Sequence, residues 1–288
     1  MLGRARSFLS VNARLLERLR YACLFEKAAP EPMLRALEAY QNPDGGYGNG
    51  LEPDLRGPES EPIPVWTALG LLDEIGEARG AVLARILEWL ESAEAKEGGI
   101  PFVFPAARAS PHAPWWETGS GKVVGSLNPT AGIVAYLFRN RTRSGWLDRN
   151  AAWCWDRIEE VRRISPYELR VVLAFLDETP ERTRAARSLE RLRPLIRSSG
   201  EIVLDAGRPG DEFRPLDFSP EPNTRSRGLW TPSEIAGHLD RIAAAQRPDG
   251  GWSVAFPIWT PLTRFEWEGV QTVEMLKTLR ANGRLGSG

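Results

Sequence analysis

The heptapeptide QNPDGGY at residues 41–47 returns almost unchanged as QRPDGGW at residues 246–252. A shorter and more degenerate copy, KEGGI, occupies residues 96–100. Proline ends a helix, the Gly-Gly pair permits positive φ, and the aromatic residue is large enough to fill a gap between two layers of helices. We therefore predict that each copy is a turn that fastens an outer helix to an inner one.

Apolar residues recur at helical spacing along most of the chain, and no stretch of two-residue alternation is long enough to predict a strand. The class expected is all-α. The spacing predicts helices over residues 6–27, 31–41, 63–76, 80–94, 128–140, 145–162, 166–178, 181–197, 232–245 and 266–282.

Two kinds of helix alternate in this series. Some are apolar nearly all round, as buried inner helices are, and others have one apolar stripe opposite charged residues. The first kind includes 63–76, 128–140 and 166–178, and the second includes 80–94, 145–162 and 181–197. The alternation predicts a single α/α toroid domain over residues 1–288, with about 10–12 helices in two concentric rings. Segment 199–231 interrupts it, so we expect a short inner element around Ile202 to Phe218.

Charge and composition exclude several classes of partner. The chain has 37 Lys and Arg against 38 Asp and Glu, so its net charge of −1 gives no electrostatic reason to expect nucleic acid or an anionic membrane surface. No signal-peptide core and no integral membrane segment is expected, and two cysteines among apolar neighbours fit a reduced, cytoplasmic protein. Eleven tryptophans indicate a very aromatic core or an aromatic pocket.

The repeated turns resemble a known motif. Residues 246–252 above all are similar to the QW repeats of squalene–hopene cyclases, other class II terpene cyclases and protein prenyltransferase β subunits. The resemblance covers two good turns and one poor one, while the alternation of helices covers most of the chain. It implies an α/α toroid of the terpenoid-cyclase and prenyltransferase kind, whose active cavity lies at the centre and opens at one end.

The chain departs from these enzymes at their chemical signatures. It has no D-x-D-D motif for protonating an alkene and no D-D-x-x-D metal cluster. Cys154 and Asp156 lie far in sequence from both histidines, so no zinc site is predicted. No cofactor is expected, except Mg²⁺ if the substrate is a diphosphate.

The loop at residues 48–61 holds the first candidate acids. Glu52 and Asp54 flank one proline, and in an extended loop both side chains project to the same side. Carboxylates held near a cavity can have their pKa values pushed apart and act as acid and base. Arg56 is a candidate substrate ligand in the same loop. The structural alternative is that one carboxylate caps the next helix or pairs with Arg56.

A second loop supplies candidate substrate contacts. Trp115, Trp116 and Glu117 lie between the predicted helices, and Asn128 stands at the start of the next one. Loop tryptophans are harder to explain as core than helical ones, and aromatic faces suit carbocations, sugars or apolar ligands. These four residues are predicted to line a pocket, with a hydrophobic lid that binds nothing as the alternative.

The irregular segment 199–231 supplies the last candidates. Asp205 follows three apolar residues, and burial would raise the pKa of its carboxyl enough for it to serve as a general acid. Phe218 and Trp230 are candidate substrate contacts nearby.

Three functions fit these features. The first is a terpene cyclase-like enzyme that acts on an isoprenoid or another small apolar substrate through a carboxylic acid. The second is a carbohydrate-active toroid, which also pairs carboxylates with tryptophans. The third is a binding or scaffold protein without catalysis. The turns favour the first function, whereas the missing D-x-D-D favours the third.

Overall fold

The computed structural model describes residues 1–117, 122–198 and 213–285, and in this part of the chain it contains twelve α-helices, three 3-10 helices and no strand. The all-α prediction is confirmed, and the order of the helices is consistent with a toroid-like fold. Two compact units share the chain: the first combines residues 1–28 with 183–288, and the second is residues 29–182. That all residues form a single domain stays a prediction.

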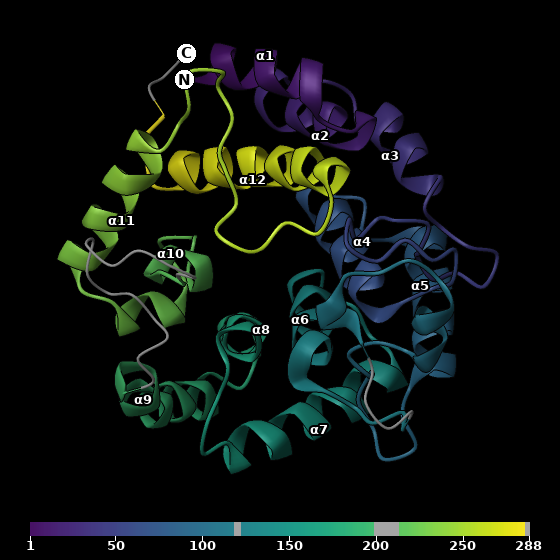
Figure 1. The fold of residues 1–288 in the computed structure, drawn as a ribbon. Helices are drawn as coiled ribbons and strands as arrows, with labels where there is room; N and C mark the ends of the chain where they lie inside the picture. The colour runs from purple at the N-terminus through teal and green to yellow at the C-terminus, as the bar shows by residue number, and fades with distance from the viewer. Residues whose placement is uncertain (118–121, 199–212, 286–288) are drawn as a thin grey trace. The chain divides into compact units, whose positions relative to one another are not determined.

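The first unit contains both ends of the chain. Its helices are α1 (Leu2–Asn12), α2 (Leu15–Glu26), α9 (Arg182–Ser198), α10 (Pro215–Phe218), α11 (Pro232–Ala244) and α12 (Pro261–Ala281), with a 3-10 turn at Arg225–Leu229. Helices α1 and α2 pack against α12 (Figure 1). Their shared core includes Phe8, Leu9, Trp252, Val273 and Leu276.

The second unit is continuous in sequence. Its helices are α3 (Glu31–Glu38), α4 (Pro62–Glu74), α5 (Gly80–Ala93), α6 (Leu127–Arg139), α7 (Gly145–Glu160) and α8 (Pro166–Glu178), with 3-10 turns at Pro105–Ala109 and Pro114–Trp116. Helix α6 packs against α4, α7 and above all α8 (Figure 1). Trp155 of α7 meets Phe175 of α8 edge to face, with ring centroids 5.0 Å apart, so this tryptophan packs between the two helices.

The repeated turns have one backbone geometry. In residues 42–46, 95–99 and 247–251 the first amide donates to the carbonyl four residues on, and the fourth amide returns to the first carbonyl, at 2.9–3.0 Å in every case. Their glycines at 45, 98 and 250 have φ of 93°, 87° and 98°. The predicted repeat is therefore confirmed as a structural repeat, including its degenerate copy.

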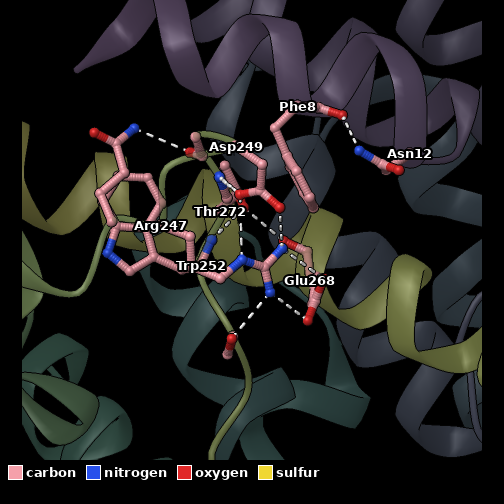
Figure 2. A network of polar contacts seen from close by, with 11 residues as sticks. Phe8, Asn12, Arg247, Asp249, Trp252, Glu268 and Thr272 are labelled. Atoms are coloured by element: carbon pink, nitrogen blue, oxygen red, sulfur yellow. Dashed lines mark hydrogen bonds and ion pairs between the residues drawn. The ribbon is translucent and has the colours of Figure 1, made fainter.

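The last turn joins three helices of the first unit. Trp252 is 2% exposed, and its indole N–H donates to the Ile242 carbonyl of α11 at 2.8 Å, while its amide donates to the Thr272 hydroxyl of α12 at 3.2 Å. Figure 2 shows Arg247 between Asp249 of the turn and Glu268 of α12, close to Phe8 of α1. The turn thus fastens α11 to α12 and α1, and the predicted roles of outer and inner helices stay a prediction.

Most helix boundaries lie within three residues of the prediction, and two places differ more. The helix predicted over 6–27 is broken into α1 and α2, because Ala13 and Arg14 are extended and Ala13 packs on Gly269 of α12. Helix α12 begins at Pro261 instead of 266, since Thr260 caps it together with Thr263. Between α9 and α11, the described residues supply one short helix, α10, where an inner element was expected.

A membrane-spanning helix would need a longer and more apolar stretch than any helix in the described part of the chain offers.

Candidate active site

The acidic loop of the second unit is folded back on itself and buried. Leu55 donates its amide to the Glu52 carbonyl at 3.1 Å, which makes a turn around Pro53. Glu52 is 6% exposed and Asp54 is 2% exposed. Acidic side chains are rarely this buried unless they are paired, and both stay among the candidate site residues.

The structure brings this loop beside the loop that carries the tryptophans. Leu55 pairs with His112 as an antiparallel bridge. On either side of that pair, Ala113 donates its amide to the Asp54 carbonyl at 2.9 Å and Arg56 donates its amide to the Pro111 carbonyl at 3.0 Å. The two loops are therefore in contact within the second unit.

The two tryptophans of the second loop have different environments. Trp116 is 5% exposed and its ring stacks on Phe102, with centroids 4.9 Å apart and planes 9° apart. Trp115 is 44% exposed. The first is therefore a packing residue that holds Phe102, and only the second presents a free aromatic face.

Glu117 closes a small polar cluster at the end of this loop. Its carboxylate lies 3.1 Å from Nε2 of His112 and 3.6 Å from Nε of Arg108. Nδ1 of His112 lies 2.7 Å from the Ser110 carbonyl. The Ser110 carbonyl and the Glu117 carboxylate favour a proton on each ring nitrogen and raise the pKa of His112 above its usual range. Glu117 thus pairs with His112 of the same loop, and this contact orients the loop.

Asn128 stands where α6 begins and is 9% exposed. Its φ of −97° and ψ of 113° are not helical, and its peptide bond to Pro129 is cis. Its side-chain oxygen is buried and accepts no hydrogen bond in the described residues. Two residues on, the Thr130 hydroxyl accepts the Ile100 amide at 2.8 Å, which ties this start to the segment that precedes the tryptophans.

Glu61 is a buried carboxyl that the sequence analysis did not single out as a candidate. It precedes Pro62 at the start of α4, it is 3% exposed, and one of its carboxyl oxygens accepts the Phe104 amide at 2.9 Å. Burial is the main reason that its pKa rises to about 8, with Glu59 adding to the rise and the Phe104 amide opposing it. The carboxyl is therefore mostly neutral at pH 7. In the sequence, the only feature that pointed to Glu61 was its position in the acidic loop at residues 48–61.

Phe218 and Trp230 belong to the first unit. Their rings stack with centroids 5.7 Å apart, the Trp230 indole donates to the Ser219 hydroxyl at 2.9 Å, and Arg197 lies over the Trp230 ring. Both are nearly buried, at 3% and 5% exposed, so packing accounts for them. Nearby His238 accepts the Leu216 amide, and burial lowers its pKa to about 3, which keeps it neutral. Asp205 lies outside the described residues.

No group of three or more His, Cys, Asp and Glu side chains in the described ranges is placed to hold a metal ion. The Mg²⁺ expected for a diphosphate substrate stays a prediction.

Fold and site together define an all-α protein with a buried acidic loop beside an aromatic one. No family model matches the chain. Drimenyl diphosphate synthase from Streptantibioticus cattleyicolor is 28% identical over 234 residues, which cover 77% of this chain and 41% of the synthase. The chain thus spans less than half the length of this relative. The similarity is a distant one to a terpene synthase.

The fold has a counterpart among solved structures. A crystal structure of a protein from Actinoplanes superposes with a TM-score of 0.62 over 98% of both chains, at 15% sequence identity. At that identity the likeness concerns the fold alone.

Proposed function

We propose that this protein is a terpene cyclase-like enzyme that acts on an isoprenoid substrate, with a carboxylic acid as its proton donor. The observation that supports it best is the similarity to drimenyl diphosphate synthase over 77% of the chain. The resemblance of the repeated turns to those of class II terpene cyclases points the same way. Since the chain matches 41% of that synthase, the activity of the whole relative is not carried over without a test.

The burial of acidic side chains supports this proposal. Protonating an alkene requires a carboxyl that stays neutral at physiological pH, and burial is what keeps a carboxyl neutral. Three carboxyls of the acidic loop are less than a tenth exposed, namely Glu52, Asp54 and Glu61. Asp205, which was predicted from the sequence as an acid, remains a candidate in the same proposal.

The substrate contacts follow from the aromatic loop. The free face of Trp115 suits an apolar chain or a developing carbocation. Asn128 has a buried acceptor that a polar substrate group could use, and Arg56 would pair with a diphosphate if the substrate carries one. We propose that the substrate is a small isoprenoid and that the protein has no nucleic-acid partner.

The test is to incubate the purified protein with farnesyl diphosphate and geranylgeranyl diphosphate, with and without Mg²⁺, and to analyse extracts by gas chromatography and mass spectrometry after phosphatase treatment. A cyclised product of unchanged elemental composition is expected. Trp115→Ala should raise KM several-fold by removing the aromatic face, whereas Asp156→Asn, on the exposed side of α7, should change nothing. If neither substrate is converted under any of these conditions, the proposal is wrong.

A further inference from the structure

An exposed apolar surface lies beside the acidic loop. Trp115, Val123 and Val124 are 44%, 45% and 61% exposed, and Phe102, Val103 and Phe104 are half-buried. Pro101 pairs with Gly125 as an antiparallel bridge, which sets the two valines beside the phenylalanines. Phe102 also stacks on Trp116, the neighbour of Trp115. We call these six residues the apolar patch, and clustered exposed apolar side chains of this kind mark a binding surface.

Glu61 is hydrogen-bonded to one residue of the apolar patch. One of its carboxyl oxygens, Oε2, accepts the amide of Phe104, which is itself a patch residue. The Glu61 amide donates to the Tyr47 carbonyl at 2.9 Å, so the start of α4 holds the residue from the other side. The acid is thus fixed at its backbone and at one carboxyl oxygen.

The other carboxyl oxygen, Oε1, is buried and has no hydrogen-bond partner in the described residues. A neutral carboxyl carries its proton on one oxygen. Since Oε2 already accepts an N–H, the proton belongs on Oε1, where no protein group in the described chain takes it up. Burying such a donor without a partner costs free energy, and retained polar groups of this sort call for an explanation.

The surroundings keep this carboxyl neutral. Burial raises its pKa, the nearby Glu59 carboxylate raises it further, and no lysine or arginine is among the groups that shift it. Phe104 meets Trp89 edge to face, with ring centroids 6.3 Å apart, so aromatic rings pack around the amide that Glu61 accepts. Because no cation stabilises its carboxylate, Glu61 keeps its proton at neutral pH and is present in the protonated form that a proton donor needs.

We propose that Glu61 is the proton donor to a carbon–carbon double bond of an isoprenoid chain bound against the apolar patch. This inference rests on the proposed function and names its acid. The π electrons of the alkene form a C–H bond with the proton, the O–H bond of Glu61 breaks, and a tertiary carbocation and a Glu61 carboxylate result. Ring closure transfers the cation, loss of a proton from the cyclised cation ends the reaction, and a proton from solvent restores Glu61, so no oxidant or reductant is needed.

The experiment compares Glu61→Gln with the wild-type protein and with Glu88→Gln, which removes an exposed carboxyl on the outer side of α5. Glutamine keeps an oxygen to accept the Phe104 amide but has no acidic proton. Turnover of farnesyl diphosphate should fall at least about 100-fold in Glu61→Gln, as expected for loss of a general acid, and stay within about twofold of wild type in Glu88→Gln. The dissociation constant of Glu61→Gln for farnesyl diphosphate should stay near the wild-type KM.

Two further results separate this inference from the proposed function. If the wild-type protein forms a product and Glu61→Gln forms it at the same rate, Glu61 is not the donor although the protein is a cyclase. If the wild-type protein forms no product from either diphosphate, both proposals fail together. If circular dichroism shows that Glu61→Gln does not fold, the side-chain carboxyl of Glu61 is titrated instead in ¹³C-labelled wild-type protein. A titration midpoint near that of an ordinary glutamate then overturns the inference.

Discussion

Glu61 shows how one residue can connect stability with chemistry. Its carboxyl is neutral in the folded protein over a pH range in which it would be ionised in the unfolded chain, because burial raises its pKa to about 8. The folded state therefore binds a proton that the unfolded state releases. This contribution to stability is complete below the unfolded pKa, near 4.5, and is lost progressively as the pH rises to about 8.

Glu61→Gln is expected to stabilise the protein at pH 8 and to flatten this dependence. An amide needs no proton to stay neutral, so the variant should gain up to about 4 kcal/mol relative to wild type at pH 8 and little at pH 4.5. Urea unfolding at pH 4.5, 6 and 8 measures it. Equal slopes of unfolding free energy against pH in wild type and variant would contradict the raised pKa.

Gly132 is a second position at which a single added side-chain atom is expected to disturb the packing. A Cβ atom there would lie 2.5 Å from Nε1 of Trp66 and 3.1 Å from a methyl group of Val171. Gly132→Ala should therefore lower the unfolding free energy by about 1–2 kcal/mol, because overpacking outweighs the helix propensity gained. Gly237→Ala is the matched control on α11, where a Cβ would meet nothing within 4 Å, and it should be neutral or stabilising. Equal effects of the two changes in urea unfolding would count against tight packing at Trp66.

Sequence alone singled out two loops that the structure places in contact, and the site they are predicted to form stays a prediction. It identified the acidic loop and the tryptophan loop, because acids and aromatic residues outside helices are visible in the sequence. It could not rank the acids, since the burial of Glu61 depends on Phe104, 43 residues further along the chain. For the same reason it treated Trp115 and Trp116 alike, whereas only Trp116 has Phe102 to pack on.

At the scale of elements, proline and capping residues explain which helix boundaries were predictable. Helix α8 matches its predicted range at both ends, because Ser165 and Glu168 form its capping box and Pro166 occupies its first position. The break between α1 and α2 was missed, because neither glycine nor proline marks it. Its cause is the contact of Ala13 with Gly269, which no local pattern in the sequence reveals.

The last repeated turn depends on one ion pair. Both terminal nitrogens of Arg247 donate to the two carboxylate oxygens of Glu268, at 2.6 and 2.8 Å, and the Glu268 side chain is only 7% exposed. Arg247→Met should lower the unfolding free energy by about 2 kcal/mol or more, because it leaves a carboxylate buried without its charge partner. Urea unfolding of the variant measures this loss.

The double variant Arg247→Met, Glu268→Met is the control for that prediction. It removes the buried charge together with its partner, so it should recover part of the lost stability. If the unfolding free energy lost in the double variant equals the sum of the losses in Arg247→Met and Glu268→Met, the ion pair does not fasten the turn to α12.

At the scale of the whole molecule, the two units differ in how far apart in sequence their contacts lie. The second unit uses 154 consecutive residues, 29–182, and its strongest helix pair, α6 with α8, is separated by one helix. The first unit joins the two ends of the chain: Arg20 of α2 pairs with Glu274 of α12, 254 residues away. The sequence indicated the alternation of helices but not this division, because hydrophobic periodicity does not reveal which distant helices pack together.

This difference predicts an order of folding. Closing a loop of more than 200 residues costs more chain entropy than pairing neighbouring helices, so contacts between α1 or α2 and α12 should form late. In pulsed hydrogen exchange during refolding from urea, amides of α6 and α8 should become protected before those of α1 and α12. Phe175→Ala, in the core between α7 and α8, should slow the early phase, whereas Phe8→Ala, in the core of the first unit, should leave the early phase unchanged and affect the late one. Simultaneous protection of all four helices would mean that the chain folds as one cooperative unit, as the single-domain prediction has it.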